Sequence, residues 1–172
     1  SDDNLCVNDR LIASHESVER FASLEQGHGI KNEEGEILAY RASSAQLQNE
    51  LPDFTWTTHS ANRLQYPEDI FSKNGEEIES DFALLTRGKK SEPISDTNQC
   101  INKENIFLEE GAKVECAILN ASSGPIYIGK NAEIMEGSIV RGGLAMCEGS
   151  ALKLGAKIYG PTTVGPYSKV GG

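Results

Sequence analysis

An aliphatic or methionine residue recurs at every sixth position in the second half of this sequence. The pattern holds without a slip over eight positions: Ile128, Ile134, Val140, Met146, Leu152, Ile158, Val164 and Val170. Four places after the first seven comes a residue that is small in six cases: Ala132, Ser138, Leu144 (the exception), Ser150, Ala156, Thr162 and Ser168. An α-helix would need apolar residues three and four apart, and an ordinary strand alternates at two. A strict period of six therefore fits neither element.

A repeating unit of one short strand and one tight turn does explain this period. The aliphatic side chain would point inward and the small residue would fit a crowded corner. Between them lie residues that tolerate a positive φ at a turn: Asn131, Gly137, Gly143, Gly149 and Gly155. Stacking each unit on the one a coil away lets the strands pair in parallel, about 4.8 Å apart. The sequence thus predicts a parallel β-helix.

The same register extends upstream to Leu108 and Val114, with Asn120 as the next predicted inward position. Residues 121–127 then shift the phase by two, which predicts a small loop. From Leu108 onward the chain supplies about three coils. It stops within a continuing turn at residues 171–172 without a cap, so we expect a truncated β-helix from a longer protein, or a partner over its end.

The charge of the chain is divided unevenly between its two halves. The net charge is −10 over 172 residues, but residues 1–97 hold 9 Lys+Arg and 19 Asp+Glu, whereas residues 98–172 hold 7 of each. This predicts a partial α/β domain over residues 1–97, with a polar linker near 91–100, followed by the β-helix over 101–172. The acidic balance argues against nucleic-acid binding, and the lack of an 18-residue apolar run argues against a membrane span.

Cys6, Cys100, Cys116 and Cys147 are widely spaced and form no Cys-x-x-Cys pair. This spacing is unsuited to a zinc site, and the cysteines are too few for a disulfide scaffold. We expect free, mostly buried thiols. No signal peptide is evident either, so a cytoplasmic protein is predicted.

The pattern of residues 1–97 predicts an α/β domain of mixed strands and helices. Residues 4–11 are expected to form a short buried strand that runs into a polar turn. We further expect a helix capped by Ser14, a hairpin turning at residues 34–35, a short helix from Ser44 to about 51–52 and a strand over 55–57. Two further helices are expected, one at residues 66–71 and one capped by Asn74. The second helix carries apolar residues at helical spacing and an acidic run interpreted as a solvated face: Ile78, Phe82 and Leu85, and Glu76, Glu77, Glu79 and Asp81.

Three stretches carry a resemblance to a known family: Val7-Asn8-Asp9-Arg10-Leu11, Tyr66-Pro67-Glu68-Asp69-Ile70-Phe71, and residues 106–172. The chain resembles the bacterial GlmU-like bifunctional sugar-1-phosphate nucleotidylyltransferases and acetyltransferases. The resemblance implies a left-handed β-helix with three hexads per triangular coil, and assembly as a homotrimer. It also implies nucleotidyl transfer to a sugar 1-phosphate such as N-acetylglucosamine 1-phosphate, with a nucleoside triphosphate and Mg²⁺, and acetyl transfer from acetyl-CoA to glucosamine 1-phosphate.

Nucleotidyl transfer needs a glycine-rich loop for the triphosphate, and residues 1–97 contain none. Gly27-His28-Gly29 is too short, so we expect the nucleotide-binding half to precede Ser1. The repeat region also lacks a histidine, the usual general base of hexapeptide acetyltransferases. No catalytic residue is therefore identified, and we expect this chain to turn over neither reaction.

The candidate substrate-binding residues are Asn8, Asp9, Arg10 and Arg141. The first three follow a strand, where α/β sheets place ligand-binding groups. Asn8 or Asp9 would meet a metal or sugar hydroxyl and Arg10 a phosphate, or all three form a surface turn. Arg141 would point outward and bind a sugar phosphate or remain a solvated cation.

Asp69 and Asn74 are weaker candidates, because helix-start and capping roles explain them. Two other functions stay open for the chain as a whole. One is a non-catalytic, trimerising or ligand-binding module, and the other is a simple hexapeptide acyltransferase.

Overall fold

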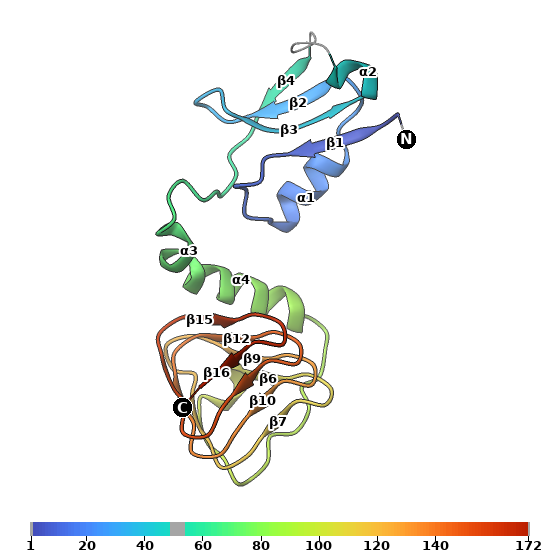
Figure 1. Cartoon of the computed structure of the whole chain (residues 1–172). Helices are drawn as coiled ribbons and strands as arrows, with labels where there is room; N and C mark the ends of the chain where they lie inside the picture. Colours follow the sequence, from blue (N-terminus) through green and yellow to red (C-terminus); the bar gives the residue numbers. More distant parts are fainter. Residues whose placement is uncertain (1, 49–53, 172) are drawn as a thin grey trace. The chain divides into compact units, whose positions relative to one another are not determined.

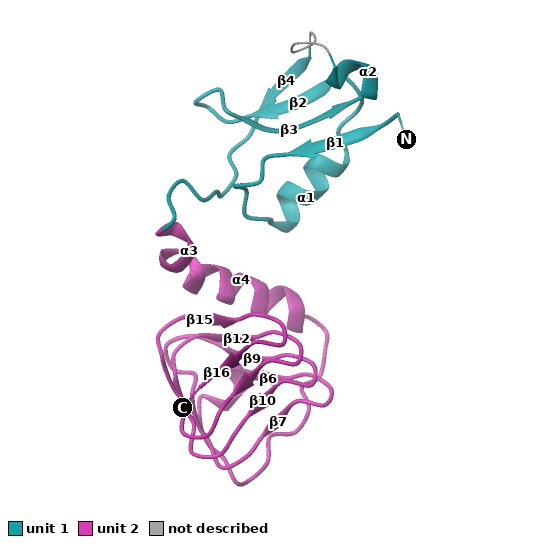
Figure 2. Cartoon of the chain, viewed as in Figure 1, with its two compact units in different colours: residues 1–67 teal, residues 68–172 magenta. Residues whose placement is uncertain are grey.

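A computed structural model describes residues 2–48 and 54–171 of the chain. It divides into two compact units, unit 1 (Ser1–Pro67) and unit 2 (Glu68–Gly172), coloured separately in Figure 2. The domain boundary predicted near residues 91–100 lies inside unit 2. The division into compact units does not test that boundary, so it stays a prediction.

Unit 1 is a small four-stranded sheet with a helix on one face (Figure 1). Its elements are β1 (Asn4–Val7), α1 (His15–Ala22), β2 (His28–Lys31), β3 (Ile37–Ala42), α2 (Ser44–Leu47) and β4 (Thr55–Thr58). The strand order is β1-β3-β2-β4. Strand β3 runs antiparallel to β1 and β2, and β4 runs parallel to β2.

The local predictions for unit 1 are largely confirmed. Ser14 caps α1 in a capping box with Ser17, and Phe21 of α1 packs into a core with Ile30 and Leu38. The hairpin turns at residues 34–35 as expected, where Gly35 has a φ of +83°. Helix α2 begins at Ser44, but the predicted end of this helix falls outside the described residues.

Unit 2 contains a parallel β-helix of about four turns (Figure 1). Its strands are β5 (Gln99–Ile101), β6 (Ile106–Leu108), β7 (Lys113–Val114), β8 (Ile118–Asn120), β9 (Ile126–Ile128), β10 (Glu133–Ile134), β11 (Ile139–Arg141), β12 (Leu144–Met146), β13 (Ala151–Leu152), β14 (Lys157–Tyr159), β15 (Thr162–Val164) and β16 (Lys169–Val170). A short 3₁₀ helix, η1 (Lys103–Asn105), follows β5. The strands form three parallel sheets, ordered β14-β11-β8-β5, β15-β12-β9-β6 and β16-β13-β10-β7.

The aliphatic positions of the repeat stack into ladders that fill the centre of the β-helix. Seven of the eight are buried and the eighth, Val170, is partly buried against the same core. The predicted three coils were too few, because a first turn begins at Gln99, before the readable repeat. Cysteine occupies its first inward position, since Cys100 pairs with Leu119 of the next turn.

The prediction that Asn120 points inward was wrong. Leu119 is fully buried instead, and it pairs with Val140 across β8 and β11. Leu119 follows Val114 by five residues rather than six, because the intervening turn is tighter and holds Cys116 at a φ of +50°. The loop expected in residues 121–127 lies before β9, which begins at Ile126, and it places Ile128 nine residues after Leu119.

Residues with a positive φ line the corners of the β-helix. They include four of the five predicted turn residues: Asn131, Gly137, Gly149 and Gly155. The fifth prediction, Gly143, was wrong, because its neighbour Gly142 takes the left-handed conformation with a φ of +101°. At that position a side chain would also approach the backbone of Gly160 in the next turn to 3.4 Å.

The segment predicted as a linker packs on the first turn of the β-helix. Ser91 and Glu92 pair with both backbone groups of Leu108, and Asn98 binds the carbonyl of Val114 and the amide of Ala117. The hydroxyls of Ser95 and Thr97 donate to Glu115. These hydrogen bonds lower the pKa of the Glu115 carboxyl, Thr97 contributing most. The segment therefore covers strand edges that would otherwise be open to pairing.

Helices α3 (Asp69–Ser72) and α4 (Asn74–Thr86) also belong to unit 2, and α4 packs on the sheet β15-β12-β9-β6 (Figure 1). The predicted capping role of Asn74 was wrong. Asn74 is the first residue of α4, and its Oδ1 accepts a hydrogen bond from Thr163 Oγ1 at 2.8 Å. The side chain thus anchors the helix to β15.

The four cysteines are free, as predicted, but none is fully buried and Cys116 is exposed. Cys116 lies in a turn, Cys6 and Cys100 lie on the edge strands β1 and β5, and Cys147 follows β12. In the part of the chain that the structure describes, no helix combines the length and apolar character that crossing a membrane requires.

Candidate functional site

The turn after β1 holds the three residues singled out in unit 1. The Asn8 side chain fixes this turn, because its Oδ1 accepts the backbone amide of Arg10 at 3.0 Å. Its Nδ2 donates to the carbonyl of Ile37 at 3.0 Å and to Glu36. The amide of Asn8 is thus engaged with the protein on both sides, which favours a positioning role over direct contact with a sugar or metal.

The β2–β3 hairpin brings two carboxylates to the same end of the sheet. Asn32 Oδ1 accepts the backbone amides of Glu34 and Glu36 at 3.1 and 2.8 Å. Its Nδ2 donates to both carboxylates. The turn therefore holds Glu34 and Glu36 side by side, in a position where their charges repel unless cations lie between them.

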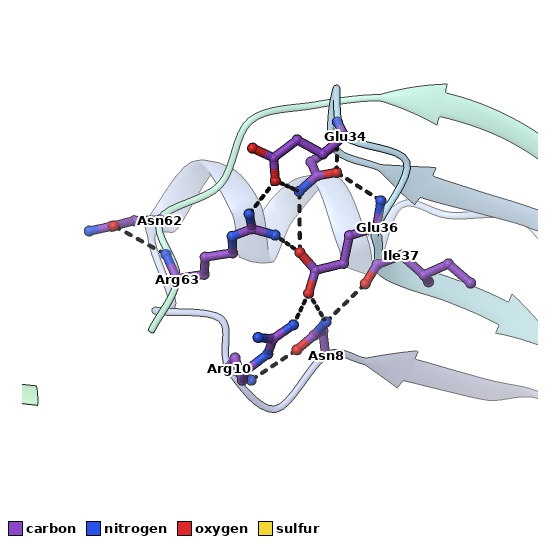
Figure 3. Close-up of polar contacts among 8 residues, drawn as sticks. Asn8, Arg10, Glu34, Glu36, Ile37, Asn62 and Arg63 are labelled. Atoms are coloured by element: carbon purple, nitrogen blue, oxygen red, sulfur yellow. Dashed lines mark hydrogen bonds and ion pairs between the residues drawn. The ribbon is translucent and has the colours of Figure 1, made fainter. Parts of the chain in front are cut away.

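Two arginines supply that positive charge (Figure 3). Arg10 forms an ion pair with Glu36, while Arg63 forms ion pairs with both Glu34 and Glu36. Glu36 therefore bridges the two guanidinium groups. We call these four charged residues, together with Asn8 and Asn32, the Arg10 cluster.

Backbone pairing explains how Arg63 reaches this cluster from far along the chain. Leu11 and Arg63 form an isolated antiparallel bridge. Ile12 donates to the carbonyl of Asn62 at 2.9 Å, and Leu64 donates to the carbonyl of Arg10 at 2.8 Å. The segment after β4 thus runs beside the segment after β1, at the end of the sheet where the hairpin turns.

The two arginines differ in their exposure and in what they can do chemically. The Arg63 side chain is only 14% exposed, whereas that of Arg10 is 50% exposed. Among the described residues, Arg10 uses one guanidinium nitrogen, Nη2, in its contact with Glu36. Its remaining donors could bind a phosphate, a geometry that guanidinium groups favour. The four charges cancel, so Arg10 would bind an anion in competition with Glu36.

Asp9 and Arg141 lie outside the Arg10 cluster. Asp9 is exposed at the tip of the turn, and the described residues give its carboxylate no hydrogen bond or ion pair. Arg141 is exposed on β11 of unit 2, beside the inward-facing Val140, as predicted. Asp69 begins α3, in agreement with a helix-start role. The proposed binding roles of Asn8, Asp9, Arg10 and Arg141 stay predictions.

The described residues do not supply a metal centre. Among residues 2–48 and 54–171, no group of three or more His, Cys, Asp or Glu side chains is placed to hold a metal ion. The two carboxylates of the Arg10 cluster, Glu34 and Glu36, form ion pairs with its arginines. The Arg10 cluster is therefore unsuited to Mg²⁺, which prefers carboxylate and water oxygens free of competing cations.

Comparison with protein families decides the assignment of the chain. A family model described as sugar nucleotidyl transferase matches residues 1–90, more than half of the sequence. The chain belongs to the sugar nucleotidyl transferase family. This match covers unit 1 and continues through α3 and α4, and it includes the Arg10 cluster. No curated protein and no solved structure matches the chain significantly.

Sequence reasoning missed Glu36 and Arg63, the most connected members of the cluster. The only local signal was Asn32, whose position before the hairpin turn is typical of a side chain that binds turn amides. Arg63 lies in an irregular segment with no periodic pattern. Its place beside Arg10 depends on the pairing of two segments that the sequence does not reveal.

Proposed function

We propose that this chain serves nucleotidyl transfer to a sugar 1-phosphate, and that Arg10 binds the phosphate of that sugar. The family match over residues 1–90 carries the proposal. The half-exposed guanidinium of Arg10, which pairs with Glu36 in a turn fixed by Asn8, supports the proposed role. N-acetylglucosamine 1-phosphate is the sugar phosphate that the resemblance suggests.

In the proposed reaction, an oxygen of the sugar phosphate attacks the α-phosphorus of a nucleoside triphosphate in line, and diphosphate leaves. A magnesium ion belongs to this proposal through the family resemblance, and it would neutralise phosphate charge. Because the described residues form no metal centre, no step is assigned to the metal. The contribution proposed for this chain is to bind and orient the sugar phosphate.

Replacing Arg10 tests this role. Arg10→Gln is expected to weaken binding of N-acetylglucosamine 1-phosphate about tenfold, since one charge-assisted hydrogen bond to a phosphate is lost. Isothermal titration calorimetry on the chain measures this, with free N-acetylglucosamine as the ligand that lacks the phosphate. Arg10→Lys, which keeps the charge but loses the planar fork, should bind with intermediate affinity.

Arg20→Gln is the matched control, because Arg20 is 49% exposed in the same unit and also pairs with a glutamate, Glu16, at 3.3 Å. Its affinity for the sugar phosphate should equal that of the unchanged chain. Equal binding by the Arg10 and Arg20 variants would remove the assigned role of Arg10. It would favour the alternative of a non-catalytic module.

The β-helix has further proposed roles through the resemblance. These are assembly as a homotrimer and acetyl transfer from acetyl-CoA to glucosamine 1-phosphate, with Arg141 binding the sugar phosphate. The exposed isoleucines of one sheet, Ile101, Ile118 and Ile139, offer an apolar surface for self-association. Size-exclusion chromatography with light scattering should give three times the 18.6 kDa chain mass. A monomer at micromolar concentration would contradict the trimer.

A cytoplasmic location also belongs to the proposal. Its support is the set of four free thiols, which a reducing compartment preserves.

A further inference from the structure

The sheet under helix α4 presents an uneven row of outward side chains. Phe107, Tyr127, Ala145 and Thr163 pair successively across β6, β9, β12 and β15. The first two rings stack nearly parallel, with centroids 6.0 Å apart. Ala145, the next residue in the row, has only a methyl group. The small side chain of Ala145 therefore leaves a gap in the row between Tyr127 and Thr163.

Helix α4 spans this gap without filling it. Its first residue, Asn74, is tied to Thr163, and Ile78 is buried near Gly143 in the same layer. A cavity of about 150 Å³ is left beneath the helix. The residues that line it come from both layers: Asn74, Glu77, Ile78, Asp81, Phe82, Leu85, Tyr127, Ala145, Met146, Cys147 and Thr163.

The size and lining of this cavity suit one aromatic ring. A protein cavity of about 150 Å³ with apolar walls holds benzene. Here Phe82, Leu85 and the ring of Tyr127 provide apolar walls. Burial and a hydrogen bond to Glu109 raise the pKa of Tyr127, so its hydroxyl stays protonated and engaged outside the cavity.

Charge at the cavity distinguishes between ligands of the same shape. Two carboxylates of α4, Glu77 and Asp81, are among its lining residues, and no lysine or arginine is. A cation is therefore favoured there and an anion disfavoured. We propose that the cavity beneath α4 is a binding site for a small aromatic ring that carries an ammonium group. The ring lies over Ala145 and the ammonium lies toward Asp81.

Three probes of similar shape test the site: benzylamine, toluene and benzoate, each titrated into the whole chain at pH 7. We expect benzylamine to bind most tightly and benzoate most weakly. Chemical-shift perturbation of amides on α4 and β12 reports the affinity and the location together. Tighter binding of benzoate than of benzylamine, or shifts confined to other elements, would overturn the proposal.

Ala145→Leu fills the cavity and is expected to weaken benzylamine binding at least tenfold. Ala83→Leu is the matched control, because Ala83 is exposed on α4 and does not line the cavity, so its affinity should be unchanged. If Ala145→Leu does not fold, Ala145→Val makes the same test with less added volume. Unchanged binding by the folded cavity-filling variant would contradict the proposal.

Asp81→Asn isolates the charge. This variant should bind benzylamine about two- to fivefold more weakly and toluene with unchanged affinity, because an exposed ion pair contributes only modestly to the binding free energy. Glu79→Gln removes a charge from an exposed position of α4 that does not line the cavity, and should change neither affinity. Equal losses in the two variants would show a general charge effect and exclude the role of Asp81.

Discussion

Leu119→Ala is expected to lower the free energy of unfolding of the β-helix by about 3–4 kcal/mol. Leu119 is fully buried and lies between Cys100 and Val140 in one ladder of inward side chains. Its truncation would leave a cavity that the stacked turns above and below cannot close. Urea denaturation followed by circular dichroism, with hydrogen exchange of β8 and β11 amides, measures the loss.

The neighbouring residues provide the controls. Ile118 is 36% exposed on the outer side of the same strand, so Ile118→Ala should cost less than about 1 kcal/mol. Asn120→Ala should also have a small effect, because Asn120 is not an inward residue. A larger loss for Asn120→Ala than for Leu119→Ala would restore the register predicted from the six-residue period and contradict the structure.

Gly129→Ala is expected to destabilise the β-helix by about 3 kcal/mol or more. A Cβ at this position would lie 2.6 Å from the carbonyl oxygen of Met146 and 3.2 Å from the carbonyl carbon of Cys147. Both are backbone atoms, so no side-chain rotation relieves the clash. The change would also stretch the hydrogen bond from the Gly129 amide to the Met146 carbonyl, which is 2.8 Å long. The midpoint of urea denaturation measures the effect.

Gly155→Ala separates this clash from the conformational cost of replacing glycine. Gly155 has a φ of +69°, but a Cβ there would meet no atom within 4 Å. Its replacement should cost about 1–2 kcal/mol, the strain of a left-handed alanine. If the two variants were equally destabilised, backbone contact between successive turns would not be the reason for glycine at position 129.

The sequence alone was sufficient to predict the β-helix. The hexad pattern repeats because every turn of the β-helix has the same geometry. The same requirement for an inward aliphatic residue therefore recurs every six residues along the chain. Ser14 was likewise predictable as a helix cap, because a capping box involves residues only three apart. In each case the structural unit that leaves the signal is short, a six-residue strand and turn or a single helix start.

The register failed at Leu119, where a tighter turn at Cys116 shifts the inward position by one residue. A turn that is one residue shorter cannot be recognised from the six-residue period, because Ile118, Leu119 and Asn120 would each fit the inward position of a short strand. Only the pairing with Val140 identifies the inward residue. The first turn was missed for a related reason, since Cys100 does not stand out as a core residue.

The candidate site was predicted only in part. Asn8 and Arg10 were found because they follow a strand, which is a local signal. Their partner Glu36 and the second arginine, Arg63, come from segments that meet only in the folded sheet. Because ion pairs between distant segments depend on topology, the residue types alone could not show that Arg10 has a carboxylate to compete with.

The sequence by itself thus determined the repeat, the division of charge between the two halves and the identity of the locally capped elements, since each arises from short-range geometry. Tertiary structure decided which residue of each strand faces inward, where α4 packs and which charges meet around Glu36. Those features depend on contacts between segments far apart in the chain, and the cavity over Ala145 arises in the same way. It exists only because a helix from residues 74–86 crosses a row of side chains assembled from four separate turns.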